Sequence, residues 1–271
     1  MQAMVSNLMS IPVWAQPLPV AILAAAACWL GACFGSFSNV LIYRLPRNLS
    51  VVGPRSFCPG CKNQVAWYDN IPLVSWLLLR ARCRRCQTTI PLRYFLLEVA
   101  GAVIALLGVL ASGWTIQGLA AAAFLLLLLD IAVIDWQHMI IPHTLSVTGM
   151  VLGLLFALAG NRDFPEAVMG LLLGGGIILA VSYGYKMLRG VVGMGGGDIM
   201  LMGMVGAFLG PWGALGTLFG GAFLGTVFAL IFGRGKVQGS AKLPFGTFLA
   251  AAAALVLFFG EGVFRWYIGR F

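Results

Sequence analysis

Residues 115–134 read TIQGLAAAAFLLLLLDIAVI, a run in which Asp130 is the one charged side chain. A helix needs about 20 mostly apolar residues to cross the hydrocarbon core of a bilayer, and this run has that length and composition. It predicts a membrane span. The acid that directly follows it, Asp135, is therefore expected at the edge of that span, where a carboxylate is costly and points to a function.

The rest of the chain has the same character. It is 61% hydrophobic and 9% charged, with a mean hydropathy of +0.96. A soluble domain is nearer a quarter charged and could not bury so much apolar surface. We expect an all-α polytopic membrane protein with about eight transmembrane helices, of which that at 198–210 is short. The other runs are 18–42, 94–112, 144–160, 166–188, 212–232 and 243–262.

Basic residues set the expected orientation. Segment 44–93 holds nine of the 17 lysines and arginines and a single acid, Asp69. Placing this segment in the cytoplasm satisfies the positive-inside rule and puts fourteen of the 17 bases inside, with both termini periplasmic. We expect three parts: 1–43 with the first span, 44–93 as a cytoplasmic loop, and 94–271 as a helical core. The bases suit contact with anionic lipid, but no aromatic-basic platform indicates nucleic acid.

Four cysteines in the basic loop have the spacing of a metal site. Cys58-Pro-Gly-Cys61 and Cys83-Arg-Arg-Cys86 are two C-x2-C pairs, and four thiolates suit a tetrahedral zinc ion. A structural disulfide is unfavourable in the reducing cytoplasm. We predict one structural Zn²⁺ in this loop, against the alternative of four free thiols. Cys28 and Cys33, in the first apolar run, are interpreted as small apolar residues.

Two aspartates are expected at one edge of the membrane. Asp198 follows the glycine-rich run 193–197, which cannot form a good helix, and the basic residues place Asp135 at the same cytoplasmic edge. Two carboxylates that meet can share a proton, so that one activates water and the other acts as an acid on a carbonyl, as in aspartic proteases. The alternatives are a helix-capping role for Asp198 and an ion or proton path.

Several motifs and their order along the chain resemble those of the type 4 prepilin peptidases, which are bacterial inner-membrane aspartic proteases of the GxGD class. The resemblance covers nearly the whole chain. It includes Asp135-x5-Ile141-Pro142 and Gly195-x-Gly197-Asp198, which match the two catalytic motifs. The other matching stretches are 35–47, 55–61, 69–72, 75–77, 82–86, 93–98 and 244–246.

The resemblance implies two activities. The enzyme would cleave the basic leader of type IV prepilins or type II secretion pseudopilins after a glycine, with Asp135 and Asp198 as catalytic residues. It would then methylate the new N-terminal amine with S-adenosylmethionine; a peptidase without this second activity is the alternative. The family commonly has lysine two residues after the GxGD aspartate, where this chain has Met200, so one neutralising charge is missing. The sequence has no glycine-rich strand–turn–helix motif of a soluble Rossmann domain, so binding of the methyl donor is implied by the resemblance alone.

The glycine run also predicts how substrate approaches. Backbone freed beside Asp198 can pair with an extended peptide, so we assign Gly195 and Gly197 to substrate binding. The alternative is that these glycines serve helix packing alone.

Overall fold

The computed structural model describes residues 18–190, 195–232 and 243–268. Within these ranges the regular elements are all helices. Eight α-helices and two short 3-10 helices form the described chain, which confirms the predicted all-α class. Contacts divide the chain into two units, 1–122 and 123–271. The division falls within α5 (Ile116–His138). The expected periplasmic position of the N-terminus concerns residues outside the described ranges.

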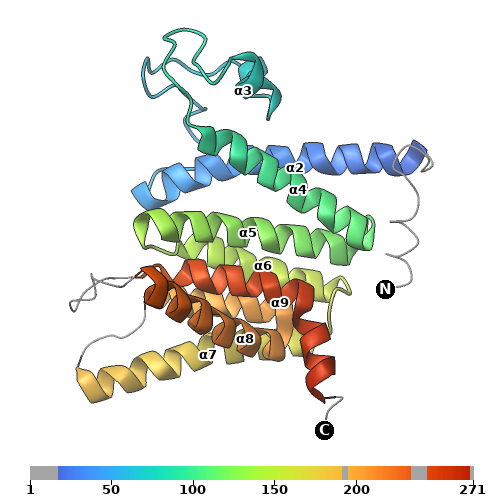
Figure 1. The fold of residues 1–271 in the computed structure, drawn as a ribbon, viewed down its shortest axis with the longest axis vertical. Helices are drawn as coiled ribbons and strands as arrows, with labels where there is room; N and C mark the ends of the chain where they lie inside the picture. Colours follow the sequence, from blue (N-terminus) through green and yellow to red (C-terminus); the bar gives the residue numbers. More distant parts are fainter. Residues whose placement is uncertain (1–17, 191–194, 233–242, 269–271) are drawn as a thin grey trace. The chain divides into compact units, whose positions relative to one another are not determined.

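The first unit is built on two helices that cross with their backbones in contact. They are α2 (Leu18–Arg44) and α4 (Leu92–Ser112) (Figure 1). Glycines make this approach possible, because a Cβ at Gly31 would meet the carbonyl of Gly101, and one at Gly35 would meet that of Leu97.

The segment between α2 and α4 carries the four cysteines. It extends from the end of α2 and the start of α4 and contains little regular structure (Figure 1). Its short helices are η2 (Leu45–Arg47), η3 (Trp67–Asn70) and α3 (Val74–Leu78).

The second unit packs its helices around the first half of α8 (Gly196–Phe232). The residues of α8 from Leu201 to Pro211 are all buried, which is rare on a helix unless neighbours surround it. Its neighbours are α6 (His143–Leu158), α7 (Phe164–Arg189) and α9 (Phe245–Ile268).

Helix α8 is two helices joined at a sharp turn. Gly210 has φ 72° and ψ −177°, a conformation that interrupts the helix, and Pro211 follows it. A Cβ at Gly174 would touch the carbonyl of Met202 and lie 3.4 Å from the Cβ of Ala214. On a straight helix those two residues would be about 18 Å apart. The chain therefore doubles back at Gly210, between the two predicted runs 198–210 and 212–232.

Five described helices are long and apolar enough to cross a membrane: α2, α4, α5, α7 and α8. Helix α6 and the Phe245–Gly260 part of α9 are shorter apolar helices by the same measure. The protein is a multi-pass membrane protein. The bases Arg234, Lys236 and Lys242, used in the orientation argument, lie outside the described residues.

Candidate active site and metal cluster

Asp135 lies near the end of α5 and is held by the start of α9. Its side chain is buried, with 4% exposed. The backbone N–H of Thr247 donates to Asp135 Oδ2 at 2.8 Å, and the Thr247 hydroxyl lies 3.2 Å from the same oxygen and 3.0 Å from the carbonyl of Ala132. A Cβ at Gly246 would lie 3.0 Å from Asp135 Oδ2, so glycine keeps the carboxylate accessible to this backbone.

Asp198 lies in the first turn of α8. The N–H of Gly195 donates to Asp198 Oδ2 at 3.1 Å, and the N–H of Asp198 donates to the carbonyl of Gly195 at 3.1 Å. This is the half of a capping box in which the third helical residue reaches back to the cap. Asp198 therefore caps α8, as one alternative predicted.

Ile141 joins the segments that carry these residues. A Cβ at Gly197 would lie 2.8 Å from the Ile141 Cβ, and one at Gly246 would lie 2.6 Å from Ile141 Cδ1. The residues of three sequence motifs, far apart in the chain, thus meet around one side chain. Gly193 and Met194, part of the glycine run, lie outside the described residues.

Asp130 is buried in the same helix as Asp135, with 3% exposed. It lies five residues before Asp135, which is about 140° around a helix, so the two carboxylates point in different directions. Thr247 donates to Asp135 and Gly195 donates to Asp198, so these hydrogen bonds do not involve Asp130. The sequence reasoning did not find Thr247, although it follows directly on the 244–246 motif, which was the available signal.

The four cysteines of the first unit form one cluster. The sulfur atoms of Cys58, Cys61, Cys83 and Cys86 all lie within 4.8 Å of one another, and the Cys58 and Cys86 sulfurs are 3.6 Å apart. Four thiolates around a tetrahedral zinc, with Zn–S bonds of about 2.3 Å, have sulfurs about 3.8 Å apart. The cluster therefore fits a metal ion of this kind.

The two C-x2-C pairs are built alike, as two copies of one turn. In each, the first cysteine N–H donates to the carbonyl five residues on, and its carbonyl accepts the N–H four residues on, at 2.9–3.0 Å. Lys62 and Gln87 hold the same position and share a positive φ, 59° and 58°. Bridges Phe57–Gln64 and Arg82–Thr89 close the two turns. This repeated geometry aims both pairs of sulfurs at a common point.

The environment of Cys86 favours its thiolate. Hydrogen bonding by the Thr88 hydroxyl, 3.2 Å from the sulfur, and by its backbone lowers the pKa of Cys86 to about 6. Hydrogen bonds from the backbone and side chain of Asn63 lower the pKa of Cys61. The thiolate is the form that ligates metal, so these neighbours suit Cys61 and Cys86 as ligands.

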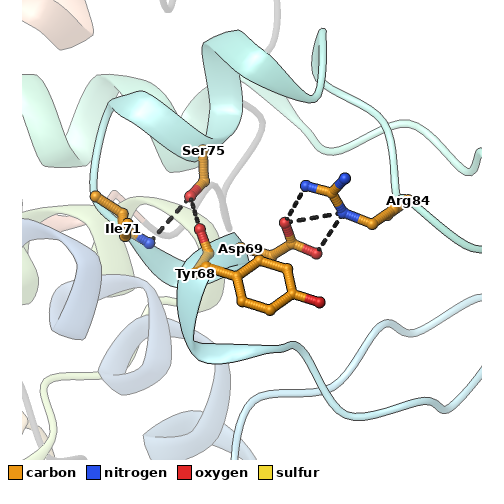
Figure 2. A network of polar contacts seen from close by, with 5 residues as sticks. All are labelled: Tyr68, Asp69, Ile71, Ser75 and Arg84. Carbon is orange, nitrogen blue, oxygen red and sulfur yellow. Dashed lines mark hydrogen bonds and ion pairs between the residues drawn. The ribbon is translucent and has the colours of Figure 1, made fainter.

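A polar network ties the second cysteine pair to η3. Arg84 donates from Nε and Nη2 to the Asp69 carboxylate at 2.7–3.1 Å, a two-pronged ion pair (Figure 2). Beside it, the Ser75 hydroxyl accepts the N–H of Ile71 and donates to the carbonyl of Tyr68, both at 3.0 Å. The Arg84 side chain is 58% exposed, so the ion pair orients the loop more than it stabilises it.

Two family models together match most of this chain. Residues 29–112 match the bacterial peptidase A24 N-terminal domain, and residues 120–230 match the type IV leader peptidase family. A prepilin leader peptidase/N-methyltransferase of Aeromonas hydrophila is 36% identical over 269 residues, covering 88% of this chain and 91% of the relative. The chain belongs to the type IV leader peptidase family.

Two other relatives carry the same name and are similar over most of this chain. A prepilin leader peptidase/N-methyltransferase of Neisseria gonorrhoeae is 31% identical, over 91% of this chain and 93% of the relative. One of Myxococcus xanthus is 41% identical, over 76% of this chain and 63% of the relative. No solved structure matches the chain. The family resemblance predicted from the motifs is thus confirmed.

Proposed function

We propose that the protein cleaves the leader peptide of prepilins or pseudopilins after glycine, with Asp135 and Asp198 as the catalytic pair. The observation that carries this proposal is that the segments bearing the two aspartates meet around Ile141, since carboxylates brought together cannot easily both ionise. One carboxylate takes a proton from water as it attacks the scissile carbonyl, and the other donates a proton to the carbonyl oxygen. The relatives named as prepilin leader peptidases support the substrate class.

The second proposed activity is methylation of the new N-terminal amine. The names of the relatives include both activities, and S-adenosylmethionine is the methyl donor that we propose.

We also propose that the four-cysteine cluster holds a structural zinc ion that stabilises the 44–93 segment. A segment with so little regular structure needs a cross-link of this kind to stay folded.

Substrate access follows from the charge distribution. We place the 44–93 segment and both aspartates on the cytoplasmic side of the inner membrane, because the bases concentrate there. A basic leader stays on that side as well, and the hydrophobic helix that follows it enters sideways from the bilayer. Gly195 lies beside Asp198 and leaves room for extended substrate backbone, whereas Gly197 packs against Ile141.

The test is a cleavage assay on purified protein with a prepilin and a labelled methyl donor. Asp135→Asn and Asp198→Asn remove an ionisable group and keep the shape, so each should lower cleavage by at least a thousandfold. Asp130→Asn is the matched control in the same helix and should retain substantial cleavage. Equal losses at all three positions would show that the pair is wrongly assigned.

A further inference from the structure

The motifs of the first unit surround a pocket that leader cleavage does not use. Its volume is about 300 Å³, and the residues that line it lie between Ser36 and Glu98, all within this unit. Residues of α2 line it at spacings of three and four, which is one helix face, and α4 contributes Tyr94 and Glu98 from one face. The α2 residues are Ser36, Asn39, Val40, Tyr43 and Arg44.

Glu98 gives the pocket its charge preference. The residue is 9% exposed, and its Oε2 accepts the N–H of Leu73 at 2.7 Å. Across the described residues no lysine or arginine forms an ion pair with Glu98, whereas Asp69, the other carboxylate of the pocket, is paired with Arg84. A buried carboxylate with no cation beside it is unfavourable. Three arginines also line the pocket, but Arg44 donates to the carbonyls of Ser50 and Pro54, Arg84 pairs with Asp69, and Arg85 donates to Asn63. Glu98 is therefore left to a ligand that brings a positive charge.

Asn39 adds a hydrogen-bond acceptor to the same pocket. It is 3% exposed and its Nδ2 donates to the carbonyl of Tyr94 at 3.2 Å. Its Oδ1 is buried and accepts no hydrogen bond from the residues that the structure describes. A buried oxygen of this kind needs a donor, which a bound ligand can supply.

Aromatic side chains also line the pocket. Tyr43, Tyr68, Trp76 and Tyr94 all border the pocket. Aromatic faces accept flat heterocycles and attract cations. Small-molecule sites combine such walls with a few polar groups in volumes of about 300–1,000 Å³.

We propose that this pocket binds S-adenosylmethionine, with Glu98 facing its cationic sulfonium and ammonium end and Asn39 accepting a hydrogen bond from it. The aromatic rings hold the adenine. The assignment rests on the methyltransferase part of the proposed function and gives it a location.

A second cavity gives the methyl acceptor a place. It has a volume of about 420 Å³ and shares Ser36, Val40 and Arg44 with the first. Phe37 and Trp67 contribute an apolar part of its lining, which suits the hydrophobic start of a processed pilin. In the transfer, an amine nitrogen bonds to the methyl carbon as the carbon–sulfur bond breaks, sulfur keeps the electron pair, and the amine proton passes to water.

The experiment measures donor binding and leader cleavage on the same purified, zinc-containing protein. Equilibrium dialysis with labelled S-adenosylmethionine gives the affinity, and prepilin processing gives the cleavage rate. Glu98→Gln keeps size and removes the charge, so it should weaken binding at least tenfold while cleavage stays within twofold. Glu166→Gln, the same change on α7, is the matched control and should bind like the wild type, as should Asp135→Asn.

Each result bears on the assignment. Wild-type affinity in Glu98→Gln overturns it. Val40→Phe, which places a ring in the shared wall, guards against a folding defect in Glu98→Gln and should also weaken binding; unchanged binding in this variant overturns the proposal equally. If the wild-type protein cleaves prepilin and binds no donor, the methyltransferase function itself fails, which separates that failure from a wrongly placed pocket.

Discussion

Two hydrogen bonds from a single residue, Thr247, reach the Oδ2 atom of Asp135. The backbone N–H remains in any variant, but the hydroxyl can be removed separately. We predict that Thr247→Val lowers kcat for leader cleavage about tenfold with little change in KM, because a hydrogen bond to a charged group contributes about 1.5–3 kcal/mol. Steady-state cleavage kinetics measure this.

Thr247→Ser is the control for the hydroxyl. It keeps the oxygen and should restore most of the rate lost in Thr247→Val. A merely structural threonine, valued for its methyl group, would give the opposite order of the two variants. That order would remove Thr247 from the site.

The site residues that could be predicted from the sequence are those whose residue type is unfavourable in its surroundings unless it has a function. A carboxylate at the end of an apolar run, or two C-x2-C pairs, needs a reason for being there, and Asp135 and Cys58 were found in this way. Thr247 is inconspicuous in an apolar run. Its contact with Asp135 spans 112 positions of sequence and arises only when α9 packs on α5.

At the scale of elements, the two glycines at the start of α8, to which the sequence analysis gave one role, have different surroundings. A methyl group on Gly195 would find only Asp198 Oδ2, at 3.4 Å, whereas one on Gly197 would meet the Cβ of Ile141 at 2.8 Å. We predict that Gly195→Ala retains most cleavage and that Gly197→Ala loses it and destabilises the fold by about 1–3 kcal/mol through overpacking. Cleavage assays and thermal unfolding in detergent check both.

A compensating change tests the cause of that loss. Ile141→Ala in the Gly197→Ala background removes the clashing atoms and should recover part of the cleavage rate, since the two residues are in contact. No recovery, with Gly195→Ala equally inactive, would favour a direct role of both glycines in holding substrate backbone.

Helix boundaries could be predicted where the length of an apolar run and the position of a glycine determine them. The break between 198–210 and 212–232 was visible in the Gly210-Pro211 pair, and the structure has its turn there. The pairing of α2 with α4 was not visible. It depends on where Gly31 and Gly101 meet, and many glycines in apolar runs carry the same spacing signal.

For the whole molecule, the two proposed chemistries belong to different units: the four cysteines and the donor pocket to 1–122, and the aspartates to 123–271. Cys58 and Cys83 line the pocket, so loss of the metal should loosen its wall. We predict that Cys83→Ser lowers bound zinc well below one ion per chain and methylation at least tenfold, while cleavage falls by less than threefold. Metal analysis and mass spectrometry of the processed pilin measure all three.

Chelation of the wild-type protein provides the matched comparison. It removes the ion without a substitution and should reproduce the pattern of Cys83→Ser, with zinc addition restoring methylation. If cleavage and methylation fall together in both experiments, the cluster supports the whole fold and the division of chemistry between the units is wrong.

In the proposed function, the turn at Gly210 also sets the depth at which peptide bonds are cut. The ion pair of Arg162 with Glu166, at 2.7 Å, lies beside this turn, and we expect charged groups of this kind at a water-facing boundary. From Gly210 the helix reaches Asp198 after a rise of about 18 Å, while the hydrocarbon layer is about 30 Å thick. Either the bilayer thins around the enzyme or hydrolysis takes place in a recess below the headgroups, so lipid thickness should control turnover.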